Sequence, residues 1–93
     1  MAEKIRKRIF LSGRVQGVGF RAYLRRKARM LNLSGWAKNL IDGRVEAVFV
    51  GAEDRVREML ELAKKGPRMG KVEEMEVIDE EHQDEFSDFS IRY

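Results

Sequence analysis

The residues best suited to chemistry in this 93-residue sequence form a glycine-spaced stretch, residues 13–21, that ends in Arg21. Because glycine has no Cβ, Gly17 and Gly19 allow turns in which several successive N–H groups point inward. Such groups form a nest for an anion, and a helix that starts near Arg21 adds its free amides and its positive dipole end. The guanidinium of Arg21 could close over the anion with a planar, two-pronged grip. The stretch therefore predicts an anion-binding loop.

Residues 13–21 also indicate which kind of anion binds, because they lack the motifs of nucleotide-binding sites. A Walker-type ATP site needs Gly-Lys followed by Ser or Thr, and this ending is absent. A dinucleotide-binding fingerprint needs a different glycine spacing and a much longer chain. We therefore expect a phosphate without an attached nucleotide, with the amide side chain of Gln16 in the same loop. The alternative is a connection whose glycines merely turn the chain, but the terminal arginine at a helix start favours the anion site.

Other residue types restrict the chemistry further. The sequence contains no cysteine, which excludes disulfides, thiolate metal sites and a cysteine nucleophile. The single His82 lies among acidic residues and is interpreted as an exposed loop residue, so a catalytic zinc site is not expected. Asn39, taken alone near a hairpin, is more often a turn residue than a reactive one. We interpret Phe20 and Trp36 as core or pocket wall.

A series of strands and helices must position these residues. Alternating apolar residues predict strands, with Ile5, Ile9 and Leu11 on one face of the first, and apolar residues at helical spacing predict two helices. In chain order we expect a strand over 5–12, an irregular loop over 13–19, a helix over 21–32, strands over 36–39 and 45–50, a helix over 56–63, a strand over 72–79, a loop over 82–85 and a short strand over 89–93.

Residues that favour turns and helix ends lie between these segments and support this order. Asp42-Gly43 predicts a hairpin turn, since glycine supplies the positive φ that tight turns demand. Gly66-Pro67 predicts the end of the second helix, and Asn32 that of the first. The resulting βαββαβ order with a short C-terminal strand indicates an α+β, ferredoxin-like split βαβ sandwich. Its sheet is mainly antiparallel, with both helices on one face, in a single domain over residues 1–93. This fold alone assigns no function.

Charge is unevenly distributed along the chain. The net charge is +3, but residues 1–44 carry twelve Lys and Arg against Glu3 and Asp42, whereas residues 45–93 are acidic overall. A basic half is compatible with nucleic acid, while a small anionic substrate needs only a local positive site. No apolar run approaches the roughly 20 residues of a membrane span. We expect a cytoplasmic monomer that does not associate with membranes. The arginines Arg25, Arg26 and Arg29 are expected to form a solvated helix face.

Two long motifs closely resemble those of the acylphosphatase family. Residues 13–21, Gly-Arg-Val-Gln-Gly-Val-Gly-Phe-Arg, look like its phosphate-loop motif without a mismatch. Residues 35–46 look like its second motif, with Ala37 where a larger residue is common. Shorter similarities are found at Gly66-Pro67, Val72 and residues 89–93. The resemblance spans nearly the whole chain.

The resemblance implies hydrolysis of a carboxyl–phosphate mixed anhydride to a carboxylate and inorganic phosphate, without metal or organic cofactor. Implied substrates include acetyl phosphate, carbamoyl phosphate and acyl phosphates of glycolysis or of aspartyl type. It assigns phosphate binding to Arg21 and positioning of the attacking water to Asn39. The backbone amides expected to bind the phosphate belong to Val15, Gln16, Gly17, Val18, Gly19 and Phe20. Arg92 and the carboxylate of Tyr93 could brace Arg21 from the sheet edge, but the sequence gives no geometry for such a contact.

Two other functions fit parts of the sequence. In one, the basic half binds RNA through phosphate contacts and stacked aromatic residues, but the expected central strands carry no aromatic pair at i, i+2. We therefore expect no nucleic-acid partner. In the other, the chain is an acylphosphatase-like domain that binds carbamoyl phosphate for a larger maturation enzyme and acts in trans.

Overall fold

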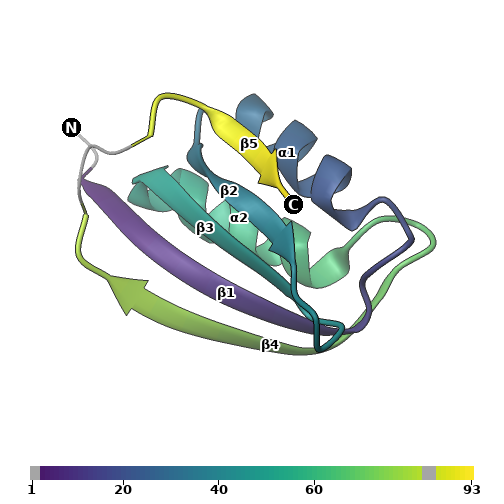
Figure 1. Cartoon of the computed structure of the whole chain (residues 1–93). Coiled ribbons are helices and arrows are strands. Elements are labelled where there is room, and N and C mark those ends of the chain that lie inside the picture. Colours follow the sequence, from purple (N-terminus) through teal and green to yellow (C-terminus); the bar gives the residue numbers. More distant parts are fainter. Residues whose placement is uncertain (1–2, 83–85) are drawn as a thin grey trace.

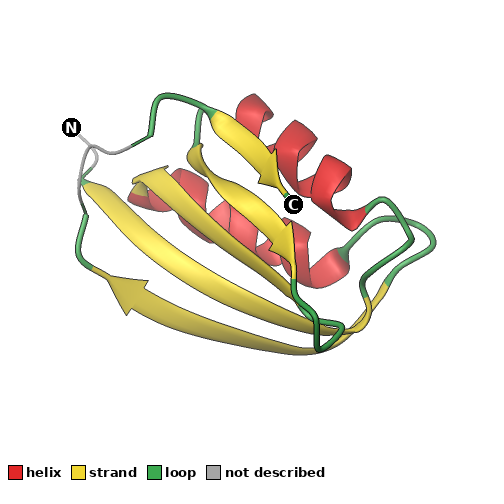
Figure 2. Ribbon diagram, in the orientation of Figure 1, coloured by secondary structure: helices red, strands yellow, loops and turns green. Residues whose placement is uncertain are grey.

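The computed structural model describes residues 3–82 and 86–93. Within these residues the elements are β1 (Lys4–Arg14), α1 (Phe20–Met30), β2 (Ser34–Asn39), β3 (Val45–Ala52), α2 (Glu53–Lys65), β4 (Lys71–Glu80) and β5 (Phe89–Arg92) (Figure 1). They form one five-stranded sheet in the order β4-β1-β3-β2-β5. Neighbouring strands run antiparallel except for β2 and β5, which are parallel. Both helices cover the same face of the sheet (Figure 2). The expected ferredoxin-like fold is confirmed.

The core lies between the sheet and the two helices. Side chains alternate along β1, so Ile9 and Leu11 point together toward the helices and are fully buried. Leu24 of α1 and Met59 of α2 meet them from the other side, both at 0% exposure. Full burial of such a side chain stabilises the fold by about 1.5–3 kcal/mol. This core holds the N-terminal end of α1 against the ends of the strands.

The opposite face of the sheet carries a smaller cluster around Trp36. This side chain packs with Val48 and Val50 and is 7% exposed, as expected for a core residue. The Arg8 guanidinium lies 5.5 Å from the centre of the Trp36 ring. The same guanidinium donates to the carboxylates of Glu46 and Glu80. Paired charges therefore cover the aromatic surface on this face.

The first strand is longer than we predicted. The expected strand ended at residue 12, whereas β1 continues through Gly13 and Arg14, which pair with β4 after a register shift at Ser12/Gly13. At Gly13 φ is +119°, and a Cβ would lie 2.4 Å from the carbonyl oxygen of Lys71. Gly13 thus permits close approach of two strands and does not belong to the irregular loop.

Helix α1 ends as Asn32 led us to expect. Helical geometry stops at Met30, and Asn32 adopts a φ of 58°. The Asn32 N–H donates to the carbonyl of Arg29, and the Leu33 N–H donates to that of Ala28. These two bonds form a Schellman motif, in which a left-handed residue closes the helix. Helix α2 ends at Gly66, whose φ is 71°.

The predicted hairpin connects β2 and β3. The Leu40 N–H donates to the carbonyl of Arg44, and the Gly43 N–H donates back to the carbonyl of Leu40. Gly43 has a φ of +97°, which completes a three-residue turn. No helix of the described residues is long and apolar enough to cross a membrane. The loop expected over 82–85 lies mainly outside the described residues, while His82 is partly buried and engaged with its surroundings.

Candidate active site

The glycine-spaced connection between β1 and α1 has the geometry of an anion-binding loop. Gly17 and Gly19 both have a φ of +76°, and a Cβ added to either would meet nothing within 4 Å. The need for glycine is therefore conformational rather than steric, since side chains at such φ values cost about 1–2 kcal/mol. Gly19 is the N-cap of α1, with no side-chain cap and no acidic residue in the first turn. The positive end of the helix is left for a ligand.

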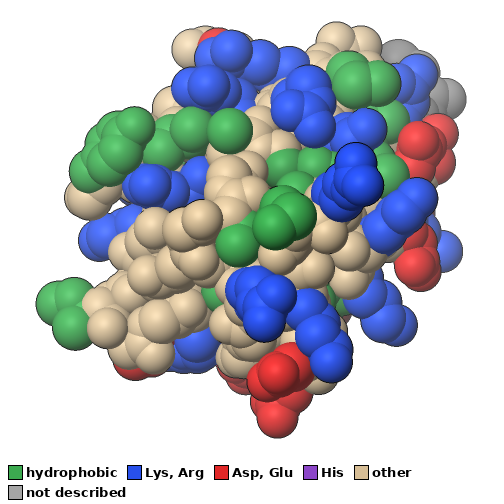
Figure 3. Space-filling model, turned by 90° about the vertical axis from the view of Figure 1, so that its right-hand side faces the viewer, with side chains coloured by type: hydrophobic (Ala, Val, Ile, Leu, Met, Phe, Trp, Pro, Cys, Tyr) green, Lys and Arg blue, Asp and Glu red, His purple; other side chains and the backbone are tan. Residues whose placement is uncertain are grey.

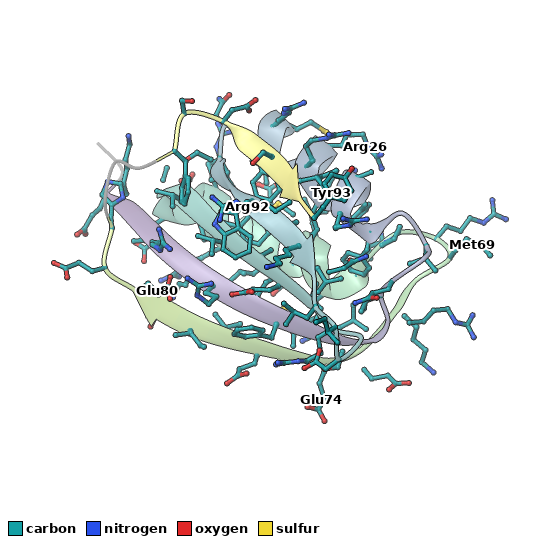
Figure 4. All side chains as sticks on the ribbon, viewed as in Figure 1. Arg26, Met69, Glu74, Glu80, Arg92 and Tyr93 are labelled. Atoms are coloured by element: carbon teal, nitrogen blue, oxygen red, sulfur yellow. The ribbon has the colours of Figure 1, made fainter. Side chains whose placement is uncertain are left out.

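Arg21 emerges from the first turn of α1 and is held against the end of β5. Its Nη1 donates to the carbonyl oxygen of Arg92 at 3.1 Å. Its guanidinium carbon lies 4.8 Å from the centre of the Tyr93 ring. The contacts of Arg21 with residues 92 and 93 thus involve a main-chain carbonyl and an aromatic ring. The Arg92 side chain points to the other face of the sheet, 4.6 Å from the centre of the Trp36 ring (Figure 4).

A cavity of about 340 Å³ brings Arg21 and Asn39 together, although they lie on different elements. Asn39 is the last residue of β2, on the same side of the strand as buried Ala37, so it faces the helices. Both site side chains are half-buried. The cavity is lined by Val15, Gly17, Gly19, Phe20, Arg21, Ala22, Arg25, Asn39, Ile91 and Tyr93.

The large apolar residues of the loop are buried in the core, although Val15 and Phe20 also line the cavity. Val15 and Phe20 are 1% and 2% exposed and belong to the core, and partly buried Val18 packs against it. Phe20 meets Tyr23 edge to face, with ring centres 5.8 Å apart. These residues can offer an anion their backbone but not their side chains. Phe20 is both core and pocket wall, as expected.

The side chain of Gln16 is engaged inside the protein, while the role expected of its backbone amide in phosphate binding stays a prediction. Its side-chain Nε2 donates to the carbonyl oxygens of Leu40 at 2.7 Å and Arg44 at 2.9 Å. Both amide hydrogens are thereby used inside the protein, so they do not serve an anion in this arrangement. The bonds tie the loop to the hairpin that directly follows Asn39. The Gln16 side chain therefore links the glycine-spaced loop to the second motif, residues 35–46, by hydrogen bonds.

The sequence analysis does not place Ala22, Arg25 or Ile91 in the cavity wall, and it names Tyr93 only as a possible brace of Arg21. Arg25 was placed on a solvated face, yet it lies four residues after Arg21 and shares its helix face. That spacing was the available signal. Ile91 is on the same side of β5 as buried Phe89, which directs it toward the helices.

The cavity is electropositive. Arg21 and Arg25 are the charged side chains of its described wall. Figure 3 shows the end of the molecule that carries the loop between β1 and α1. On this surface Lys and Arg cover more area than Asp and Glu. Nearby Asp42 is engaged, since the backbone N–H and the guanidinium of Arg44 donate to it and lower its pKa. Among residues 3–82 and 86–93, no group of three or more His, Asp and Glu side chains could hold a metal ion.

The fold and the cavity define a class: a small α+β domain with a positively charged cavity of about 340 Å³ where one helix starts and two strands end. Comparison with known sequences makes the class specific. The sequence model of the acylphosphatase family matches residues 7–91. The chain belongs to the acylphosphatase family, whose members are hydrolases.

Several acylphosphatases are similar to this chain over almost its full length. The acylphosphatase of Syntrophobacter fumaroxidans is 47% identical over 91 residues, covering 98% of this chain and 94% of its own. That of Caldivirga maquilingensis is 47% identical over 94 residues, covering 100% and 99%. The crystal structure of acylphosphatase from Bacillus subtilis superposes with a TM-score of 0.92 at 38% identity, over 96% of this chain and 99% of that one.

A larger protein contains a similar domain. The structure of full-length HypF in its phosphate- and nucleotide-bound form matches all of this chain with a TM-score of 0.90 and 28% identity. The match covers 12% of the HypF chain. The fold therefore occurs both in proteins of this size and as one part of a much longer one.

Proposed function

We propose that this protein hydrolyses the carboxyl–phosphate bond of acyl phosphates to a carboxylate and inorganic phosphate. The observation that carries the proposal is the single cavity in which an uncapped helix start, Arg21 and Asn39 meet. Membership of the acylphosphatase family supports the same reaction. Small acyl phosphates such as acetyl, carbamoyl and glycolytic acyl phosphates are the substrates that we expect.

The loop and Arg21 provide the charge stabilisation that the reaction needs. Phosphoryl transfer rewards positioning of the reactants and neutralisation of charge on the equatorial oxygens. Backbone N–H groups of residues 15–20 bind these oxygens, and the guanidinium of Arg21 grips them from α1. Its contacts with β5 fix its orientation before substrate arrives. Loss of one such preorganised donor typically lowers the rate about 10²–10³-fold.

Asn39 positions the attacking water. Its side chain has a carbonyl that accepts from water and an amide that donates to a phosphate oxygen. The water then attacks phosphorus from the Asn39 side, and the acyl oxygen leaves on the opposite side with the bonding electrons. The proton of the water passes to an oxygen of the substrate's own phosphate. Because an acyl phosphate has a good leaving group, this scheme requires neither a metal nor a strong nucleophile.

RNA binding is the less favoured function. Sheet-type RNA readers stack bases on exposed aromatic rings. Here Trp36 is 7% exposed, beneath the guanidinium of Arg92. The second alternative, a carbamoyl-phosphate-binding domain that serves a larger enzyme, draws on the likeness to HypF. The near-complete coverage of acylphosphatases of similar length favours independent hydrolysis.

Phosphate release from benzoyl phosphate in the presence of a metal chelator tests this function. We expect turnover that survives the chelator and competitive inhibition by inorganic phosphate. Complete dependence on added magnesium would contradict the mechanism. Binding of phosphate without turnover of benzoyl, acetyl or carbamoyl phosphate would instead favour the binding-domain alternative.

A further inference from the structure

The cavity wall contains a second arginine, Arg25, to which the proposed reaction gives no task. It follows Arg21 by four residues on α1, and Cβ atoms at this spacing lie about 5–6 Å apart on one helix face. The Arg25 side chain is half-buried and lines the cavity together with Tyr93. A guanidinium in this place is part of the site rather than of the solvated surface.

Arg25 differs from the arginines on either side of it along the helix face. Arg21 donates to the main chain of β5. Arg29 makes a two-pronged ion pair with Asp88, through Nε at 3.3 Å and Nη2 at 2.9 Å. Within residues 3–82 and 86–93, Arg25 makes no direct hydrogen bond, ion pair or ring contact; its charge acts at longer range on Asp88, where it contributes, after the hydrogen bonds of Phe89 and Arg29, to a lowered pKa. Its cation is therefore available to a ligand that enters the cavity.

The direction of the reaction decides which part of a ligand reaches Arg25. The phosphoryl group is served by the loop amides and Arg21. Since attacking and leaving oxygens are roughly in line, the acyl group must point away from the water on Asn39. Asn39 belongs to the sheet layer and Arg25 to the helix layer. The acyl group therefore extends along the wall formed by α1.

A neighbouring groove is the other place where an acyl group could lie. It has a volume of about 610 Å³ and is lined largely by apolar side chains, including exposed Ile41. This groove includes Asn39 in its own wall. Asn39 also lines the 340 Å³ cavity, but the wall of the groove contains neither Arg21 nor Arg25, so an acyl group in the groove would leave the helix start that binds the phosphate.

We propose that Arg25 is a specificity-determining residue that binds a second anionic group, carried by the acyl part of the substrate. The favoured substrates are then acyl phosphates whose acyl group bears a carboxylate or a phosphate. This inference rests on the proposed function, from which it takes the places of phosphate and water. A guanidinium binds either anion through two parallel N–H bonds.

The test compares substrates that differ only in one charge. Rates are measured with benzoyl phosphate, para-carboxybenzoyl phosphate and para-phosphonobenzoyl phosphate, for the wild type and for Arg25→Gln, Arg25→Lys and Arg26→Gln. Arg26 is an exposed residue of α1 outside the cavity wall, so its variant controls for loss of one positive charge. The two anionic substrates distinguish carboxylate from phosphate recognition.

We expect the wild type to have a higher kcat/KM for at least one anionic substrate than for benzoyl phosphate. Arg25→Gln should lower this ratio about tenfold, because a hydrogen-bonded charge contact is lost. Arg25→Lys should restore part of the ratio, and Arg26→Gln should keep all of it. Equal loss of kcat/KM on all three substrates, or a wild type without preference, would overturn the proposal.

Binding measurements separate this inference from the proposed function. The stable phosphonate analogues of benzoyl phosphate and its para-carboxy derivative are titrated calorimetrically into the same proteins. If no substrate is turned over, the proposed function fails. The role of Arg25 in anion recognition would still be supported by an affinity preference that Arg25→Gln abolishes. It would be overturned by equal affinity for both analogues.

Discussion

In the proposed mechanism, Arg21 and Asn39 come from different elements and have different tasks in the cavity. Arg21 comes from the first turn of a helix and carries a permanent charge, while Asn39 comes from the end of a strand and is neutral. The first suits the phosphate and the second suits the water. Because their tasks differ, their substitutions should affect different kinetic constants.

Substitution of Arg21 should impair both binding and turnover. Arg21→Gln removes the cation that faces the phosphoryl group, so we expect kcat/KM for benzoyl phosphate to fall at least about 100-fold. Inhibition by inorganic phosphate should weaken in parallel. Arg21→Lys serves as the control, since it keeps the charge but loses the two-pronged geometry and should be intermediate. An unchanged phosphate inhibition constant would remove Arg21 from the phosphate site.

Substitution of Asn39 should impair turnover alone. Asn39→Ala removes the groups that hold the water, so kcat should fall about 100-fold or more while inhibition by phosphate stays close to that of the wild type. Steady-state kinetics with phosphate as inhibitor measures both constants. If phosphate binding weakened by the same factor as kcat, Asn39 would act on the phosphoryl group rather than on the water.

Part of the cavity wall could be predicted from the sequence and part could not, for physical reasons. Gly17 and Gly19 indicated positive φ through their own chemistry, and Arg21 follows directly in the chain. The partner of the Gln16 amide is set by tertiary structure, since the carbonyls that it reaches lie 24 and 28 residues later. The position of Arg25 in the cavity likewise depends on where β5 packs. No local sequence pattern predicts the Gln16 hydrogen bonds or the position of Arg25.

At the scale of elements, the site depends on the way strand and helix ends are held together. β1 leads into the loop, β2 ends at Asn39, and β5 lies beside β2 with Lys38 opposite Arg92. The Gln16 bonds and the contacts of Arg21 with β5 cross between these ends. A displacement of any one strand end would therefore change the cavity.

The pairing of β1 with β4 predicts an effect of Gly13→Ala on stability. The new Cβ would lie 2.4 Å from the Lys71 carbonyl oxygen at a φ of +119°. We expect the free energy of unfolding, measured with urea, to fall by more than the roughly 1–2 kcal/mol of positive-φ strain alone. Gly43→Ala is the matched control, because it has a φ of +97° and open space around the new Cβ. Equal losses for the two variants would show that the close approach of the strands is unimportant.

At the scale of the whole molecule, the pattern of apolar residues determined the fold. Alternation at Ile9 and Leu11 and helical spacing around Leu24 were sufficient to predict the layers, because burial acts on every element in the same way. The exact end of β1 was not predicted, since it depends on a register shift against a strand some 60 residues later. Pattern predicts which face is buried, but not where two distant backbones separate.

The charged face of the sheet predicts a pH-dependent contribution to stability. Glu80 accepts hydrogen bonds from Arg8 and Arg6, which lower its pKa below the ordinary value near 4.5. A lowered folded-state pKa stabilises the protein above the unfolded-state value, and this stabilisation is lost as pH falls through the folded-state value. Glu80→Gln should therefore be less stable than the wild type at neutral pH.

The difference in unfolding free energy between wild type and Glu80→Gln should shrink as the pH is lowered below about 4. Denaturant titrations over a series of pH values measure it. Glu58→Gln, an exposed substitution on α2, provides the control for removal of one surface carboxylate. A Glu80→Gln difference that stays constant down to acid pH would contradict the ion-pair assignment.

The central claim is that water held in the Asn39 side of the cavity attacks the phosphorus of an acyl phosphate bound by the loop and Arg21. Hydrolysis of benzoyl phosphate in water enriched in the heavy oxygen isotope, with a metal chelator present, tests it most directly. Mass spectrometry of the products should find the label in inorganic phosphate and none in benzoate. Label in benzoate, or no hydrolysis under these conditions, would contradict it.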